Sequence, residues 1–105
     1  MTKRLFISQP MANKSPEEIR VERDSALVYA EYNLGGDFEE IDSYFPDPIN
    51  ELIAGDKKGL LLLGKSLELL ATADAAFFCS DWYKARGCQI EHLCCEKYNI
   101  PIIYD

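Results

Sequence analysis

The stretch Ala75-Ala76-Phe77-Phe78-Cys79 is the longest wholly apolar run in the chain. Five apolar residues without a polar interruption, bounded by Asp74 and Ser80, are typical of a short strand that is buried on both faces. Such a strand belongs in the centre of a parallel sheet. The remaining elements are therefore read outward from it.

The segments on either side of this strand have helical and strand patterns. Residues 59–72 upstream form an apolar helix, with one stripe made of Leu60, Leu63, Leu67 and Leu70. Downstream, a third helix is expected from Gly87 or Cys88 to Tyr98, and a last strand over Ile100–Tyr104 with Pro101 near its start.

The first half of the chain supplies two more strands and a helix. Lys3–Ser8 reads as a strand, and Ser15-Pro16-Glu17-Glu18 is a capping box that starts a helix ending at Gly35-Gly36. That helix carries an apolar side made of Ile19, Ala26, Leu27, Ala30 and Leu34, which Glu22 and Arg23 interrupt. Phe38–Tyr44 is a weaker strand, Tyr44–Pro48 a loop, and Ile49–Ala54 one or two helical turns.

This alternation of strands and helices predicts a parallel sheet with helices on both faces. In such a sheet the ligand is bound beyond the carboxyl ends of the strands. The loops at that edge are Ser8–Lys14, Tyr44–Pro48 and Ser80–Cys88.

Length and charge limit the classes of protein. A chain of 105 residues is expected to form one domain over residues 1–105. Its 18 acidic and 11 basic residues give a net charge of −7, which disfavours a partner that is a nucleic-acid polymer. No apolar run approaches the ~20 residues of a membrane span and no secretion signal is seen, so a cytoplasmic protein without a membrane partner is expected.

The four cysteines, Cys79, Cys88, Cys94 and Cys95, are expected to be reduced thiols that are buried or half-buried. Cys88, His92 and Cys95 would share one face of a helix and could hold zinc, but no second cluster supplies a fourth ligand. We therefore predict no metal and no cofactor.

Glu91 is the candidate catalytic residue. Counted around the last helix, Leu93, Cys94 and Tyr98 fall on the sheet-facing side, Glu91 at its margin, and His92 on the outer face. A carboxylate there would be partly desolvated and near the expected ligand crevice. The alternative is a first-turn glutamate that complements the helix dipole.

Polar residues near the helix starts are the candidates for ligand binding. Arg86-Gly87 could bind a carboxylate or phosphate, or Arg86 could pair with Asp81 on the surface. Ser8, with residues 13–15, could surround an anion in a similar way, although no glycine-rich phosphate-binding pattern is present.

Three segments resemble nucleoside 2-deoxyribosyltransferases and the related nucleotide N-glycosidases, especially small phage-borne or bacterial members of unknown function. They are LFISQPM at residues 5–11, SLELLATAD at 66–74 and GCQIE at 87–91. The order of the segments and the frame of strands and helices match over most of the chain, best over residues 60–105. The motifs are short.

The resemblance implies a flavodoxin-like, Rossmann-like three-layer α/β sandwich and a retaining displacement at the anomeric carbon of a nucleoside or nucleotide. Glu91 matches the family's nucleophile, which would attack C1′ while the base departs. Ser8, Gln9, Ser66, Asp81, Arg86 and Gly87 would complete the substrate pocket. We predict four parallel strands in the order 2-1-3-4.

The chain departs from the family pattern at three positions. Ser66 stands where the family commonly has an aspartate, Phe6 where it has a tyrosine, and Ala85 where it has Asp or Ser. A serine cannot supply a carboxylate's charge. These departures leave two alternatives, an enzyme of this type and a non-catalytic nucleotide-binding or sensing module.

A third possibility is an accessory protein that acts through protein contacts. The helix over residues 59–72 is apolar on nearly all sides, which favours a second subunit or another protein against it. We expect a homo-oligomer, with a dimer favoured.

Overall fold

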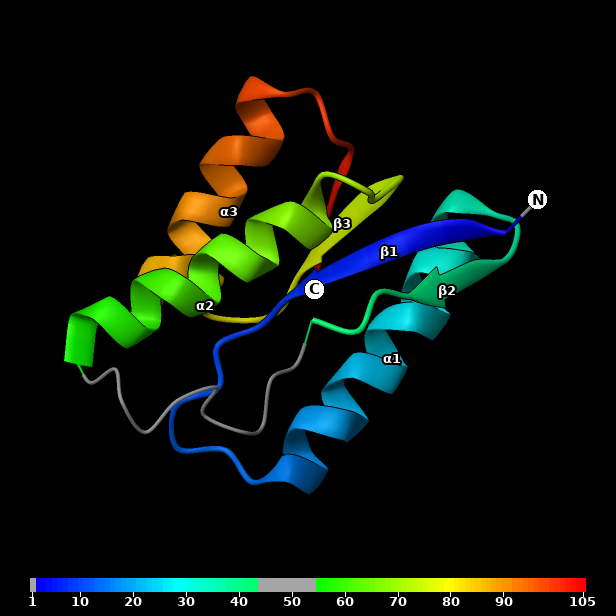
Figure 1. The fold of residues 1–105 in the computed structure, drawn as a ribbon. Coiled ribbons are helices and arrows are strands. Elements are labelled where there is room, and N and C mark those ends of the chain that lie inside the picture. The colour runs from blue at the N-terminus through cyan, green and yellow to red at the C-terminus, as the bar shows by residue number, and fades with distance from the viewer. Residues whose placement is uncertain (1, 44–54) are drawn as a thin grey trace.

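The computed structural model describes residues 2–43 and 55–105. Within these residues the elements are β1 (Lys3–Ser8), α1 (Pro16–Leu34), β2 (Phe38–Glu40), α2 (Gly55–Leu70), β3 (Ala75–Phe78), the short 3₁₀ helix η1 (Trp82–Lys84), α3 (Arg86–Lys97) and β4 (Ile102–Tyr104) (Figure 1). The strands pair in parallel in the order β2-β1-β3-β4. The predicted fold and strand order are confirmed.

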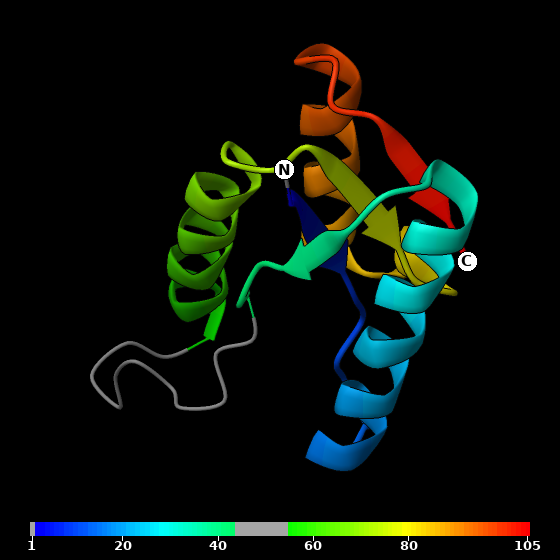
Figure 2. The ribbon, with the colours of Figure 1, turned by 90° about the vertical axis from the view of Figure 1, so that its right-hand side faces the viewer.

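The helices form two outer layers around this sheet. Helix α1 lies on one face, and α2 and α3 lie on the other (Figure 2). Side chains of a strand alternate between the two faces. In β1, Leu5 and Ile7 therefore contact α1, whereas Phe6 points toward α2 and α3.

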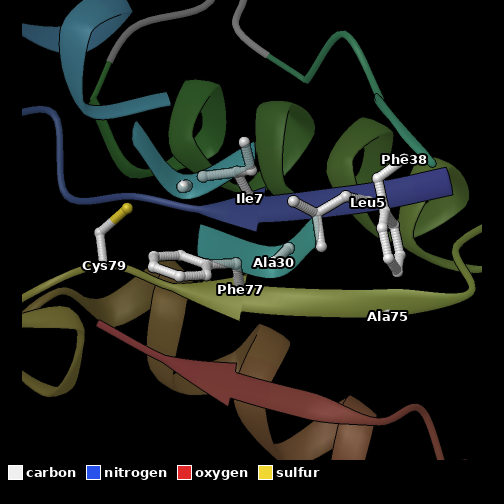
Figure 3. Close-up of a cluster of buried hydrophobic side chains, with 8 residues drawn as sticks. Leu5, Ile7, Ala30, Phe38, Ala75, Phe77 and Cys79 are labelled. Atoms are coloured by element: carbon white, nitrogen blue, oxygen red, sulfur yellow. The ribbon is translucent and has the colours of Figure 1, made fainter. Parts of the chain in front are cut away.

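Strand β3 is buried along its whole length, as the apolar run predicts. Phe77 is 2% exposed and packs in the layer under α1, and Phe78, with no exposed surface, packs in the opposite layer. Figure 3 shows the cluster under α1, which consists of Leu5, Ile7, Ala26, Ala30, Phe38, Ala75, Phe77 and Cys79.

The start of α1 is the predicted capping box. The Glu18 amide donates to Ser15 Oγ, and the Ser15 amide donates to Glu18 Oε1, both at 3.1 Å. These bonds satisfy two of the N–H groups that lack a partner at a helix start. The helix ends at Leu34 and is followed by Gly35 and Gly36, both at positive φ, as predicted.

Strand β2 is shorter than predicted and ends at Glu40 rather than Tyr44. The carbonyl of Ile41 accepts a hydrogen bond from Arg23 instead of continuing the ladder. Strand β4 begins at Ile102 rather than Ile100, because the Ile100 amide caps α3 by donating to the carbonyl of Cys95. The loop predicted at Tyr44–Pro48 and the turns predicted at Ile49–Ala54 lie outside the described residues.

Helix α2 starts earlier than predicted and ends at Leu70, and its leucine stripe is only partly buried. Leu70 is 2% exposed, whereas Leu60 is 69% exposed. The prediction that another subunit covers this helix remains a prediction. In the described parts of the chain, no helix combines the length and apolar character that a membrane span requires.

Candidate active site

A cleft of about 340 Å³ lies beyond the carboxyl end of β1. One wall is the loop after β1, a second is α2, and a third is the beginning of α3. Its lining residues are Phe6, Ile7, Gln9, Pro10, Met11, Ala12, Ser43, Gly59, Leu62, Leu63, Ser66, Ala85, Gly87, Cys88 and Glu91. The cleft therefore occupies the edge of the sheet where ligands bind in folds of this architecture.

Glu91 lies in this cleft on α3 and is 7% exposed. Ser8, the last residue of β1, donates a hydrogen bond of 2.6 Å from its hydroxyl to Glu91 Oε1. Burial raises the pKa of Glu91 to about 7, although the Ser8 hydrogen bond and the charge of Arg23 pull in the opposite direction. Glu91 is thus divided between its carboxyl and carboxylate forms near neutral pH.

The prediction of which face of α3 is buried was wrong. The buried face is rotated about the helix axis by ~100°, the angle between successive residues, from the predicted one. The buried side chains are Cys88, Glu91 and Cys95, whereas Leu93 is 51% and Tyr98 78% exposed. The pattern of apolar residues predicted a different face because the face that is buried includes a carboxylate, that of Glu91. Glu91 is therefore more central to the cleft than its sequence position indicated.

His92 is also not the solvated residue that was predicted. Its ring stacks on Trp82 with centroids 4.1 Å apart, and its Nε2 lies 2.6 Å from the Tyr104 hydroxyl. Its Nδ1 lies 3.3 Å from Glu96. Among the described residues no group of three or more metal-binding side chains is close enough to hold a metal ion.

Three of the predicted binding residues line the cleft together with Glu91: Gln9, Ser66 and Gly87. Arg86 is exposed at the rim, where its guanidinium lies near Gly59 of α2. Asp81 is outside the lining and 3.5 Å from Lys84. The structure therefore gathers most, but not all, of the predicted pocket.

Both N–H groups of the Gln9 amide have protein partners. Its nitrogen donates to the carbonyl of Ile19 at 3.1 Å and to Glu22 at 2.6 Å, and its oxygen accepts from Arg23 at 3.3 Å. Gln9 shapes the wall of the cleft rather than offering a free donor to a ligand.

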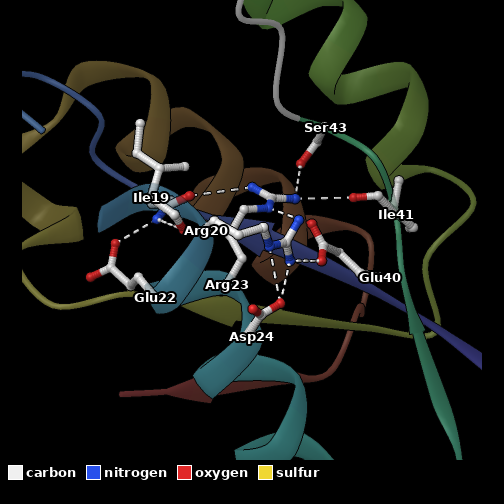
Figure 4. Close-up of polar contacts among 9 residues, drawn as sticks. Ile19, Arg20, Glu22, Arg23, Asp24, Glu40, Ile41 and Ser43 are labelled. Atoms are coloured by element: carbon white, nitrogen blue, oxygen red, sulfur yellow. Dashed lines mark hydrogen bonds and ion pairs between the residues drawn. The ribbon is translucent and has the colours of Figure 1, made fainter. Parts of the chain in front are cut away.

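Sequence reasoning missed the most buried charge of the molecule, Arg23, which it treated as an interruption of an apolar face. Arg23 is 1% exposed, and its Nε donates to Glu40 at 2.5 Å (Figure 4). Its Nη2 donates to the carbonyl of Ile41 at 3.1 Å and to the Ser43 hydroxyl at 3.0 Å. Burial raises the pKa of Glu40, but the bonds from Arg20 and Arg23 outweigh it and leave that pKa lowered.

The cysteines are buried or half-buried, as predicted. Cys88 lines the cleft one turn before Glu91, and burial raises the pKa of its thiol to about 11. The thiol is therefore protonated at neutral pH and is a poor nucleophile.

Three positions depart from the pattern of the family that the sequence resembles, and all three line this cleft: Phe6, Ser66 and Ala85. Glu91 is the one carboxylate among the described lining residues. The cleft thus combines one buried carboxylate with hydroxyl and apolar side chains.

Fold and site together define a three-layer α/β protein with a buried carboxylate at the carboxyl edge of a parallel sheet. No protein-family model and no curated protein matches the sequence. Two solved structures share the fold. A 2-deoxyribosyltransferase from the psychrotolerant bacterium Bacillus psychrosaccharolyticus superposes with a TM-score of 0.60 at 16% identity, over 96% of this chain and 70% of that one.

The second similar structure is a conserved protein from Enterococcus faecalis V583, with a TM-score of 0.61 and 15% identity. The match covers 99% of this chain and 63% of that protein. Both similarities establish the fold of this chain, which is that of the 2-deoxyribosyltransferase.

Proposed function

We propose that this protein cleaves the N-glycosidic bond of a nucleoside or nucleotide, or transfers its deoxyribosyl group, with Glu91 as the nucleophile. The observation that carries the proposal is the buried Glu91 carboxylate in a cleft at the ligand-binding edge of the sheet. The similarity to a 2-deoxyribosyltransferase supports the choice of substrate class.

The geometry suits a carboxylate nucleophile. Ser8 engages Oε1 of Glu91, and no hydrogen bond within the described residues takes Oε2. The free oxygen would attack C1′, the bond between C1′ and the base nitrogen would break, and its electron pair would leave with the base, which takes up a proton. Water or a second base then cleaves the glycosyl ester and restores the carboxylate.

Only the ionised form of Glu91 can attack. With a pKa of about 7, kcat/KM for base release should fall tenfold for each pH unit below that value. A rate that stays constant between pH 5 and pH 7 would contradict the raised pKa of Glu91.

The decisive experiment is chromatographic detection of free base from deoxynucleosides and nucleoside monophosphates, with and without an acceptor base. Glu91→Gln should lower base release by at least about a thousandfold, because it removes the nucleophile itself. Glu96→Gln is the matched control, since Glu96 lies on the same helix with 57% of its side chain exposed. Unchanged release by Glu91→Gln would overturn the mechanism.

A second candidate function is a non-catalytic module that binds a nucleotide. It is favoured by Phe6, Ser66 and Ala85, because with these residues the described lining holds no carboxylate besides Glu91. Saturable binding of a nucleotide by the wild-type protein, without release of base between pH 5 and pH 8, would select this function.

A further inference from the structure

Ser43 follows strand β2, lines the cleft and is 6% exposed. The sequence does not single out Ser43, because it is one small polar residue inside the weak strand predicted over Phe38–Tyr44. Strand order brings Ser43 to the cleft, because β2 pairs with β1. Ser8, the last residue of β1, donates a hydrogen bond to Glu91. Ser43 and Glu91 therefore belong to neighbouring parts of one cleft.

Among the described residues the hydroxyl of Ser43 has one hydrogen-bond partner, and that partner is a donor. Arg23 Nη2 donates to Ser43 Oγ at 3.0 Å, and an arginine cannot accept a hydrogen bond. The hydroxyl hydrogen must therefore point away from the guanidinium. Among the described residues no acceptor receives it, and a buried donor without an acceptor is unfavourable.

Arg23 cannot turn to change this orientation. It is 1% exposed, and three of its other four N–H groups donate to Glu40 at 2.5 Å, Gln9 at 3.3 Å and the carbonyl of Ile41 at 3.1 Å. A planar guanidinium bound to two separate segments, Gln9 after β1 and residues 40–43, is a rigid support. It fixes both the place of Ser43 and the direction left for its hydrogen.

We propose that Ser43 donates this hydrogen bond to an acceptor oxygen or nitrogen of the nucleoside bound in the cleft, and that Arg23 is the positioning residue that orients it. The inference rests on the proposed function for the identity of the ligand. Its geometry stands on the contacts of Arg23 and Ser43 alone.

The test measures dissociation constants by calorimetry for deoxynucleosides and nucleoside 5′-monophosphates, in the Glu91→Gln background so that no turnover occurs. Adding Ser43→Ala should weaken binding by about tenfold, the worth of one hydrogen bond. Ser43→Thr keeps the hydroxyl and should stay within about twofold. Ser25→Ala, which alters an exposed serine of α1, is the matched control and should have no effect.

The panel also locates the acceptor. A loss that differs among bases places the acceptor on the base, and an equal loss for all bases places it on the sugar. Unchanged affinity of Ser43→Ala for every ligand that binds would overturn the proposal.

The positioning role of Arg23 has its own readout. Arg23→Lys keeps the charge but not the planar fork, and it should weaken binding when Ser43 is present and add little when Ser43→Ala is already in place. Independent losses would show that Arg23 acts structurally and not through Ser43.

Failure of this inference is distinguishable from failure of the proposed function. Base release by the wild-type protein with unchanged affinity in Ser43→Ala defeats the inference alone. Binding that depends on Ser43, without any base release by the wild-type protein, defeats the proposed catalysis alone. If no member of the panel binds, both fail.

Discussion

The two halves of α1 are buried by opposite means. In its second half, Ala26 and Ala30 bring the helix backbone close to Leu5 and Phe77, and the contact is wholly apolar. In its first half, Arg23 takes the corresponding inward place and is surrounded by hydrogen-bond partners. The apolar half contributes stability through burial alone, whereas the polar half must offset the desolvation of a charge.

The difference separates stability from function along one helix. The apolar half lies over the middle of the sheet, away from the cleft lining. The polar half holds Gln9 and Ser43, which both line the cleft. The cleft therefore depends on the half of α1 whose burial is energetically more demanding.

The largest effect on stability is expected where β3 packs under the apolar half of α1. Phe77→Ala removes a buried ring that packs edge-on against Tyr29, with the ring centroids 5.7 Å apart. The substitution should lower the free energy of unfolding by about 4 kcal/mol. Phe77→Leu is the control and should cost about 1 kcal/mol. Chemical denaturation measures both. A loss below 1 kcal/mol for Phe77→Ala would mean that this half is not the main source of stability.

The polar half should respond differently to single and double substitutions. Arg23→Met leaves buried acceptors without a donor and should cost about 3 kcal/mol. Adding Glu40→Gln removes the charge that Arg23 neutralises, so the double variant should lose less than the sum of the two single losses. Additive losses in denaturation experiments would show that the two side chains are not energetically coupled.

The smallest effect concerns pH and the cleft carboxylate. The folded-state pKa of Glu91 is raised above its unfolded value, so its contribution to stability is present at low pH and is lost as the pH rises through about 7. Glu91→Gln removes this dependence. The wild-type protein should lose about 2 kcal/mol of unfolding free energy between pH 5 and pH 8 that Glu91→Gln does not lose. The unfolding free energy of the variant therefore rises relative to that of the wild-type protein by this amount.

Paired thermal and denaturant unfolding curves at both pH values measure this difference. Glu96→Gln, on the exposed side of the same helix, should show no comparable trend. A constant difference between Glu91→Gln and the wild-type protein would contradict the raised pKa.

The fold could be predicted because its signals are local and mutually consistent. The apolar run at Ala75–Cys79, the capping box at Ser15 and the glycines after Leu34 each specify an element without reference to the rest of the chain. The strand order was predicted together with the flavodoxin-like fold that the resemblance implies. The length of β2 was less accurate because a contact with the distant Arg23 takes the carbonyl of Ile41 where the strand ends.

The polar site could be predicted only in part. Glu91 was a candidate both from its position on the last helix and from the resemblance, although the periodicity of α3 misplaced its face. Arg23 and Ser43 were missed because hydrophobic patterning treats a charged or small polar residue as exposed. Their burial depends on one another and on Glu40, and such mutual dependence is not visible in a linear pattern.

The stacking of Trp82 on His92 has an optical consequence. Trp82 is the only tryptophan in the chain, and its partner His92 immediately follows Glu91 on α3. The two rings are stacked, with their centroids 4.1 Å apart and their planes inclined by 12°. The protein thus carries its own fluorescent reporter beside the helical turn that bears the cleft carboxylate, and a displacement of that turn would change the emission without any added label.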